Sequence, residues 1–281
     1  MTIQDRTEPA APLKRAKSAG EDVGQSTAFE ALARAGFAAR GLIYGIIGVL
    51  ALKLAIGDGG KTTDQSGALK TIAHQPFGRF LLIAVAIGLA GYALWRFVHV
   101  FLGHGPESSD SGFERVGAFG SGIAYAALCV FAIEILLGSG GSSSARTTKA
   151  TGGALGWPGG TWIVGIAGAV LIGTALYQGY RGLTKDFLKD AKTGEMGSTT
   201  KRVYKWLAVF GHCARMVVFG LVGIFLLKAA IDYEPRKAVS LDGALAKLAN
   251  QSYGHALLGL VAAGLIAFAL YSFADVRYRK I

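Results

Sequence analysis

The chain has 281 residues, of which 52% are hydrophobic and only 17% are charged, against about 25% charged residues in typical soluble domains. A water-soluble protein of this size cannot bury so much apolar side chain and keep so few charges for its surface, so the composition excludes an ordinary soluble domain and indicates that lipid is the solvent. The formal net charge of +11 is then explained by anionic lipid, nucleic acid or the signal for membrane topology.

The chain begins with a polar segment. Residues 1–28 carry many charges and no apolar run that could form the core of a signal peptide, so we expect a disordered tail that is not cleaved. Both cysteines, Cys129 and Cys213, fall inside apolar stretches. A disulfide framework of the secreted type is therefore excluded, and both residues are expected to be small core side chains.

Six apolar stretches follow, each close to the roughly 20 residues that cross a hydrocarbon core of about 30 Å. They cover residues 37–56, 80–102, 116–137, 162–177 with an apolar lead-in from 154, 206–231 and 253–274. Because the backbone of a lipid-exposed span must satisfy its own hydrogen bonds, each stretch is predicted to be a helix. The predicted fold class is an all-α membrane protein with six transmembrane helices.

The basic residues indicate the orientation of these spans. Most Lys and Arg residues near the predicted membrane boundaries fall on the side that carries both termini. The positive-inside rule then predicts a multi-pass membrane protein with cytoplasmic N- and C-termini. An interfacial aromatic belt is expected on the same side, formed by Tyr92, Trp95, Tyr177, Tyr204, Trp206 and Tyr271.

The chain repeats itself three times. Segment 32–40 matches segment 207–215, and a weaker copy lies between them. Matched positions include Gly45 with Gly220, Gly48 with Gly223, Tyr44 with Tyr125, and Lys53 with Glu134 and Lys228. We therefore predict three parallel helical hairpins, related by a pseudo-threefold axis or by simple succession. The predicted parts are a cytoplasmic tail (1–28), hairpin repeats at 29–104, 112–183 and 203–281, and a basic cytoplasmic linker (184–202).

A Gly-Ala-Leu sequence precedes the second helix of each copy, at residues 67–69, 153–155 and 243–245. In the first and third copies it opens a short amphipathic segment that is expected to lie along the outer interface. Together with Gly78, Gly254 and the Tyr-Ala-Leu-Trp-Arg sequence at 92–96, this pattern resembles the bacterial membrane proteins of domain of unknown function family 1206, over about residues 30–280.

The middle copy departs most from that pattern, with a shorter outer segment and Gln178 where the first copy has Arg96. The resemblance implies an integral protein of the bacterial inner (plasma) membrane with three copies of a hairpin domain. It implies no activity, because the family's label assigns none.

Glycines line one face of two predicted helices. Gly41, Gly45 and Gly48 share a face of the first helix, and Gly220 and Gly223 repeat part of that face in the fifth. Small residues let transmembrane backbones approach closely, so the pattern chiefly predicts packing inside the monomer. Oligomerisation and the lining of a pore are the alternatives.

One charged position recurs in every copy, as Lys53, Glu134 and Lys228. A lysine near the outer boundary can extend its ammonium group to the interface, but a carboxylate between Ile133 and Ile135 needs a partner or a proton. If the hairpins pack around one centre, the three residues form an intramembrane charge cluster. A structural ion pair, part of a solute or proton path, and plain interfacial exposure are all open interpretations.

Arg40, Arg96 and Arg215 lie on the side of the termini, where contact with lipid phosphate is the expected role. No catalytic arrangement, metal site or cofactor site is predicted, and no fold that binds nucleic acid is present. The expected partners are membrane lipid, including anionic lipid, and a protein partner or second copy. Two functions remain: a structural or accessory membrane component that binds lipid or a partner, or a small-solute or ion transporter that uses Lys53, Glu134 and Lys228.

Overall fold

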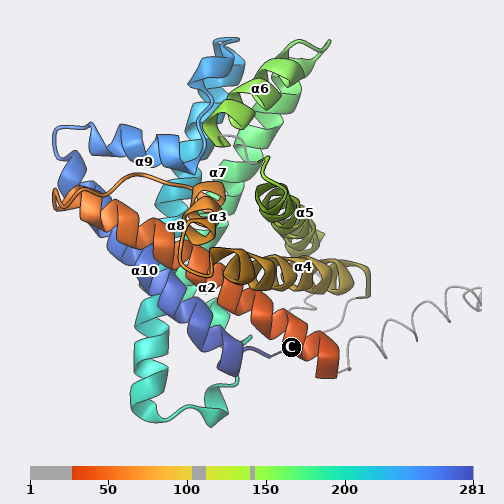
Figure 1. Ribbon diagram of the computed structural model, residues 1–281, viewed down its shortest axis with the longest axis vertical. Coiled ribbons are helices and arrows are strands. Elements are labelled where there is room, and N and C mark those ends of the chain that lie inside the picture. Colours follow the sequence, from red (N-terminus) through yellow and green to blue (C-terminus); the bar gives the residue numbers. More distant parts are fainter. Residues whose placement is uncertain (1–26, 103–111, 140–142, 281) are drawn as a thin grey trace, which may run out of the picture.

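The computed structural model describes residues 27–102, 112–139 and 143–280. The described chain is all-helical, and six of its helices are long and apolar enough to cross a membrane, as predicted. They are α2 (Thr27–Ala55), α4 (Gly78–Leu102), α5 (Gly112–Leu136), α7 (Gly160–Thr184), α8 (Ser198–Ile231) and α10 (Gly254–Tyr278) (Figure 1). Several of these helices extend past the predicted apolar stretches at the end of the bundle where α2 begins and α10 ends.

Three short helices connect the long helices at the opposite end, namely α3 (Gln65–Ala73), α6 (Ser143–Leu155) and α9 (Leu241–Ala249). The prediction of a shorter outer segment in the middle copy is wrong, because α6 has 13 residues whereas α3 and α9 have 9 each. Single-turn 3-10 helices lie at Asp186–Leu188 (η1), Thr193–Glu195 (η2) and Pro235–Lys237 (η3).

A glycine begins the second long helix of every repeat. A methyl group on Gly78, Gly160 or Gly254 would overlap a carbonyl oxygen at the end of the preceding short helix, Ala73, Ala154 and Ala249 respectively. The short helix therefore turns directly into the long one, and only glycine allows that close approach.

The strongest packing joins different repeats. Each first helix packs along the second helix of another repeat: α2 along α10, α8 along α7, and α5 along α4. Figure 1 shows α2 beside α10. This cyclic exchange of partners is what a pseudo-threefold arrangement produces, whereas a simple succession of hairpins would not pair the first repeat with the third.

The three interfaces share one register. A methyl group on Gly48 would lie 3.0 Å from the Ala262 carbonyl oxygen of α10, and one on Gly223 would lie 3.0 Å from the Gly168 carbonyl oxygen of α7. At the equivalent place in the third interface, the Cys129 thiol on α5 donates to the Ala86 carbonyl of α4 at 3.4 Å. Small side chains at this position let the two helices of each pair approach closely.

At a second position of each interface, a glycine on one helix packs against a large side chain on the other, and the helix that carries the glycine differs between interfaces. Gly41 on α2 packs against Phe273 of α10, and Gly122 on α5 packs against Phe97 of α4. In the remaining interface the glycine is on the other helix, where Gly179 of α7 lies against Met216 of α8. Each interface thus pairs one glycine with one large side chain, although the helix that supplies the bulk differs.

Packing within repeats is complete only in the first and third. A methyl group on Gly36 would lie 2.5 Å from the Tyr92 Cβ, and one on Gly211 would lie 2.7 Å from the Phe268 Cα, so these hairpins are closed at their crossing. The equivalent Gly117 has no described atom within 4 Å of such a methyl group, and α5 and α7 do not pack along each other in the described chain. The middle repeat is therefore an open hairpin, which the sequence did not predict.

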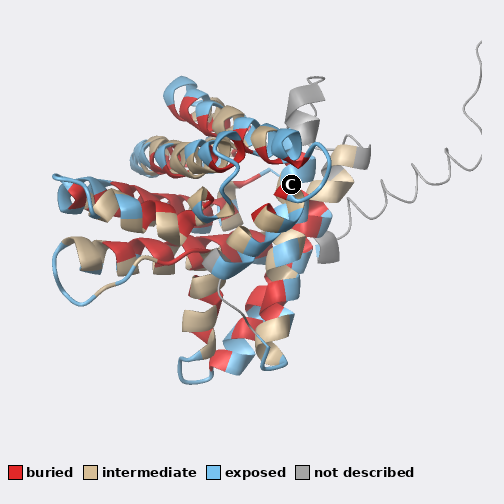
Figure 2. Ribbon diagram, turned by 90° about the horizontal axis from the view of Figure 1, so that it is seen from above, coloured by how far each residue is buried: buried red, intermediate tan, exposed pale blue. Residues whose placement is uncertain are grey.

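Figure 2 shows buried residues where helices face one another and exposed residues on the outward surfaces. The centre of the bundle is apolar, with Ile43 and Ile47 of α2 packed with Leu258 and Leu265 of α10. Most buried polar side chains of the described spans gather instead at the end of the bundle where α10 ends, among them Arg40, Ser272 and Asp275.

Candidate functional site

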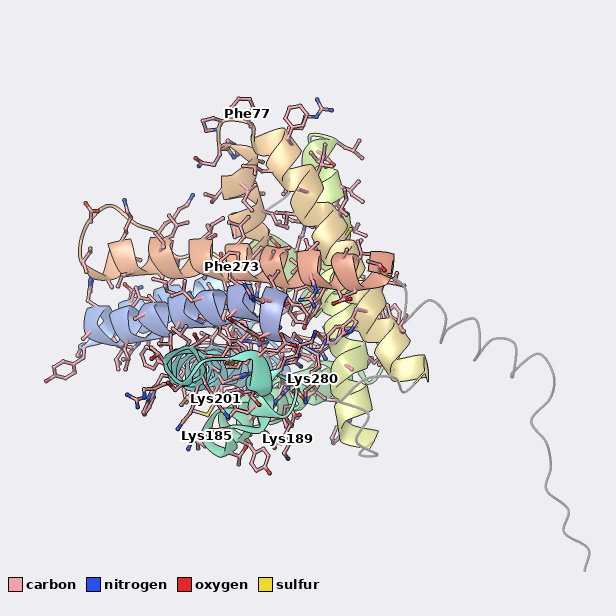
Figure 3. All side chains as sticks on the ribbon, turned by 90° about the horizontal axis from the view of Figure 1, so that it is seen from below. Phe77, Lys185, Lys189, Lys201, Phe273 and Lys280 are labelled. Carbon is pink, nitrogen blue, oxygen red and sulfur yellow. The ribbon has the colours of Figure 1, made fainter. Side chains whose placement is uncertain are left out.

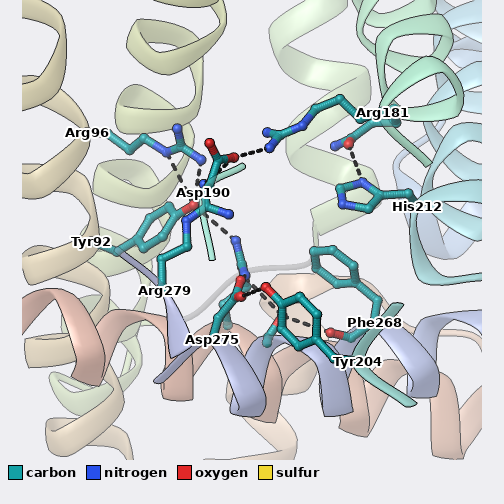
Figure 4. A network of polar contacts seen from close by, with 12 residues as sticks. Tyr92, Arg96, Arg181, Asp190, Tyr204, His212, Phe268, Asp275 and Arg279 are labelled. Atoms are coloured by element: carbon teal, nitrogen blue, oxygen red, sulfur yellow. Dashed lines mark hydrogen bonds and ion pairs between the residues drawn. The ribbon is translucent and has the colours of Figure 1, made fainter. Parts of the chain in front are cut away.

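A buried polar network, of which Figure 4 labels Tyr92 and Asp275, joins α2, α4 and α10. Arg40 of α2 is its centre. Its guanidinium donates from Nε to the Ser272 hydroxyl at 3.0 Å, from Nη1 to the Tyr92 hydroxyl at 3.1 Å, and from Nη2 to Asp275 Oδ2 at 2.9 Å. Arg40 is 6% exposed and Asp275 is fully buried. The buried pair is tolerated because each donor of Arg40 has an acceptor and each oxygen of Asp275 has a donor.

Two tyrosines complete the coordination of these charges. The Tyr204 hydroxyl of α8 donates to Asp275 Oδ1 at 2.7 Å. The Tyr92 hydroxyl accepts a second set of bonds from Arg96, at 3.2 Å from Nε and 2.8 Å from Nη2. Helices of the first and third repeats thus meet around one ion pair.

The linker between α7 and α8 folds back over this network. Asp190 in the linker forms ion pairs with Arg181 of α7 and, at 3.2 Å, with Arg279 beyond the end of α10. A backbone bridge pairs Ala191 with Arg279, and the Phe187 ring is fully buried and stacks on His212. The linker, predicted only as a basic connection, therefore closes the end of the bundle.

Burial sets the electrostatics of this closure. Burial raises the pKa of Asp190 above the ordinary value for a carboxyl group, and the Arg181 guanidinium opposes that rise. Burial also lowers the pKa of Arg279, with a further decrease from the neighbouring Arg96 charge. In this site of low dielectric, the charged forms of Asp190 and Arg279 are thus favoured by their ion pairs and disfavoured by burial.

Arg215 occupies the place in the third repeat that Arg40 occupies in the first, but its surroundings differ. Its guanidinium lies 4.4 Å from the Phe268 ring centre and 4.9 Å from that of Phe219. The orientation of the Gln178 amide that satisfies both neighbours accepts from Arg215 Nη1 and Nη2, at 3.1 and 3.0 Å, and donates to His212 Nδ1 at 2.8 Å. Among the described residues, no carboxylate forms an ion pair with Arg215.

The repeat register explains that difference. Gln178 stands where Ser272 contacts Arg40, and Arg181 stands where Asp275 does, so the second interface has a guanidinium in place of the carboxylate. In the α4–α5 interface the arginine lies on the other helix. Ser121 of α5 is equivalent to Arg40, and Arg96 of α4 is equivalent to Ser272. Each interface carries an arginine at one level, but only the α2–α10 interface supplies its own carboxylate.

We name this set of side chains the arginine network; it consists of Arg40, Arg96, Arg181, Arg215, Arg279, Asp190, Asp275, Tyr92, Tyr204, Gln178, His212 and Ser272. Asp275 pairs with Arg40, and Asp190 pairs with Arg181 and Arg279, whereas no described carboxylate pairs with Arg215. A guanidinium without a carboxylate partner is suited to holding an anion rather than to acid–base chemistry. Across the described residues, no group of three His, Cys, Asp or Glu side chains could hold a metal ion.

The arginine network corrects the predicted lipid contact of Arg40 and most of the predicted aromatic belt. Arg40 does not contact lipid, because it is buried and bonded to Asp275. Arg96 and Arg215 are half-buried and lie against aromatic rings, and their contact with lipid phosphate stays a prediction. The predicted aromatic belt is also wrong in large part. Tyr92, Trp95, Tyr204 and Tyr271 are all buried at 7% exposure or less, whereas Trp206 is 63% exposed. Aromatic and cationic side chains at this end pack on each other instead of facing the headgroups.

The predicted charge cluster at the opposite end does not form ion pairs among its members. Glu134 of α5 pairs with Arg146 of α6, and Lys53 pairs with Asp58 at 3.7 Å. Lys228 is exposed, and no described carboxylate pairs with it. The Glu134–Arg146 pair ties α5 to α6 and so bridges the outer end of the open middle hairpin.

The predicted glycine face is used inside the molecule. Gly41, Gly45 and Gly48 face α10, where a methyl group on Gly45 would lie 3.6 Å from Ala269 Cβ. Gly220 and Gly223 face α7 in the same way. These residues are contacts between repeats.

Three residues of the network carry no individual signal strong enough for sequence reasoning to find them: Asp275, Asp190 and Arg181. Asp275 and Arg181 share one repeat position with opposite charge, and that reversal is the available signal. Asp190 offers no such signal, because a carboxylate in a basic linker is expected to be solvated. Only the folded structure shows that the linker buries it.

The repeats of this chain also occur in other proteins. Residues 35–103, 116–185 and 210–279 each match the family model described as Domain of Unknown Function (DUF1206). The chain is similar to the uncharacterized protein YxxB of Bacillus subtilis, with 35% identity over 252 residues, which is 88% of this chain and 90% of that protein. No solved structure matches the chain.

Proposed function

Because the chain belongs to the family described as Domain of Unknown Function (DUF1206), which assigns no activity, we propose from the arrangement of its charges that it is an accessory membrane component, without catalytic activity, that binds anionic lipid. The observation that carries the proposal is the gathering of arginine and lysine side chains at one end of an otherwise apolar bundle, where Arg215 has no carboxylate partner among the described residues. Basic side chains at a membrane boundary attract anionic headgroups.

The surface around this end supports the same interpretation. Lys185, Lys189, Lys201 and Lys280 gather there, remote from the exposed Phe77 at the opposite end (Figure 3). Lysines near a membrane surface each contribute about 1 kcal/mol of attraction to anionic lipid. The basic residues can thus act first on the membrane surface and then on a bound headgroup.

The bundle centre gives no support to a transport path. Between the arginine network and the short outer helices, the buried side chains of the described spans are apolar, among them Ile47, Ala51, Val261 and Leu258. A path for a charged or hydrated solute needs polar groups or water along it. The glycine faces are occupied by α10 and α7, so they offer no free surface to a protein partner.

Lipid-dependent unfolding tests the proposal. The purified protein in a neutral detergent is heated with added phosphatidylglycerol, cardiolipin or phosphatidylcholine. At anionic lipid concentrations about 100-fold above Kd, binding stabilises the fold by about 2.7 kcal/mol, which raises Tm by about 5 °C or more. The shift should shrink with added salt. An equal shift with phosphatidylcholine, or none with either anionic lipid, contradicts the proposal.

A further inference from the structure

The geometry points to one particular lipid site: we infer that the open middle hairpin admits a phospholipid from the hydrocarbon, and that its phosphate is the counter-ion of Arg215. This site rests on the proposed function and gives it a location in the fold. Three features define it, namely an unpaired cation, an unpartnered buried donor beside that cation, and an opening to lipid.

The unpaired cation is Arg215. Arg40, its equivalent in the first repeat, is neutralised by Asp275. Arg215 has no carboxylate partner among the described residues, because Arg181 occupies the repeat position equivalent to Asp275. Arg181 itself forms an ion pair with Asp190. A guanidinium within a membrane span is costly without an anion or water near it. The fold therefore keeps a cation that the described protein does not neutralise.

The unpartnered donor is His212. With the Gln178 nitrogen donating to Nδ1, the ring proton lies on Nε2. His212 is 5% exposed, and its Nε2 has no hydrogen-bond partner among the described residues. A buried N–H group without a partner is unfavourable, and a hydrogen bond to an acceptor oxygen removes that penalty. Phosphate oxygens are acceptors of that kind, and they also bind guanidinium groups in pairs.

The opening lies between α5 and α7. Gly117 is the repeat equivalent of Gly36 and Gly211, which pack tightly and close the other two hairpins. No described atom lies within 4 Å of a methyl group placed on Gly117. The Arg215 side chain is half-buried, whereas Arg40 is 6% exposed, so a ligand can reach this cation from outside the fold. On the other border, Val170 of α7 is 56% exposed, whereas its equivalents Gly88 and Gly264 pack closely.

A lipid fits these features better than a free anion. The opening is lateral and apolar, since Ala124 on α5 is exposed there whereas its equivalents Ile43 and Val218 are buried in the closed hairpins. At its outer end the Glu134–Arg146 pair joins α5 to α6 and bounds the space. An acyl chain between α5 and α7 would bury the exposed apolar surface while the phosphate reaches Arg215.

The experiment measures the phosphatidylglycerol concentration that gives half of the maximal Tm shift in the full-length protein. Arg215→Gln is compared with Arg202→Gln, which removes the same charge from an exposed site on the same helix. Arg215→Gln should raise the half-maximal concentration about tenfold or more, as expected for loss of a charge-assisted bond. Arg202→Gln should change it less than about twofold.

A second variant, Gly117→Leu, blocks the opening without touching any charge. Since Gly117 has open space around it, the variant should keep the Tm of the lipid-free protein and still require at least about fivefold more lipid. It decides the question if Arg215→Gln fails to fold. Inorganic phosphate is added in a parallel series and should give no shift.

The outcomes separate the two proposals. No response of the unaltered protein to any anionic lipid would overturn the proposed function and this site together. A response that survives both Arg215→Gln and Gly117→Leu overturns the site and leaves the proposed function standing. An equal response to inorganic phosphate that Arg215→Gln abolishes means that a free anion, and not a lipid, is the counter-ion, and it overturns the lipid site.

Discussion

Arg40 directs all three of its nitrogen atoms at side-chain oxygens on other helices, and Asp275 receives bonds from two helices, α2 and α8. Such a pair is not strongly stabilising in itself, because two ions lose their hydration when they are buried. It does penalise every arrangement that separates its members. As single residues, Arg40 and Asp275 thus determine which surfaces of α2, α4, α8 and α10 come together.

Removing one member of this pair should be costly. Asp275→Ala leaves the Arg40 charge buried without a counter-ion and should lower the free energy of unfolding by about 3–5 kcal/mol. The double variant Arg40→Met with Asp275→Leu should lose much less, because no charge remains buried. Reversible unfolding in mixed detergent micelles measures both. A double variant as unstable as Asp275→Ala would show that the charges, and not only their balance, are required.

Among the helices, one interface is built three times with different residues. The small residues Gly48, Gly223 and Cys129 keep the helices of each pair close together. The adjoining space is filled by Phe273, Phe97 or Met216, from whichever helix carries the larger side chain. The helix pairs tolerate this exchange because cores conserve volume more strictly than identity. The small residues set the register of each helix pair, and that register does not depend on which helix carries the large side chain.

The exchange of bulk can be tested by reversing it. Gly179→Phe places a ring against Met216 and should destabilise the protein by about 1–3 kcal/mol through overpacking. Adding Met216→Gly recreates the Gly41–Phe273 arrangement and should restore much of the loss, with a coupling energy of about 0.5–3 kcal/mol. Unfolding of the two single variants and the double variant closes the cycle. Additive losses would mean that the α7–α8 and α2–α10 interfaces are not equivalent.

In the molecule as a whole, two hairpins are closed and the middle hairpin is open. The order of packing is α5, α4, α2, α10, α8, α7, with α5 and α7 left without mutual packing in the described chain. The linker with Phe187 and Asp190 covers the arginine end. The opening at Gly117 therefore lies between two membrane-spanning helices, α5 and α7.

Six spans place Lys61 and Lys201 on opposite sides of the membrane, and both are exposed. In a background with Cys129→Ala and Cys213→Ala, Lys61→Cys should react with a membrane-impermeant maleimide in intact cells. Lys201→Cys should react only after permeabilisation. The reverse pattern would overturn the predicted orientation alone, whereas reaction of both residues from one side would overturn the six-span topology.

The membrane environment, the six long helices and the three repeats could all be predicted from the amino-acid sequence. These properties depend on local information: apolar length decides whether a segment spans lipid, and glycine decides where two backbones can touch. The Gly78, Gly160 and Gly254 turns and the faces of Gly48 and Gly223 follow from that information, as the contacts at those positions illustrate.

Which charges meet depends on tertiary packing. Lys53, Glu134 and Lys228 share one repeat position, yet Glu134 pairs with Arg146 from a short helix. Arg40 and Arg215 share another, and one is neutralised by a carboxylate of the described chain while the other is not. The reason is physical: a repeat sets the depth of a side chain, but its charge balance depends on segments outside the repeat register and on which hairpin closes. The depth of the arginines is therefore a property of the sequence, whereas the absence of a carboxylate beside Arg215 in the described chain is a result of the packing.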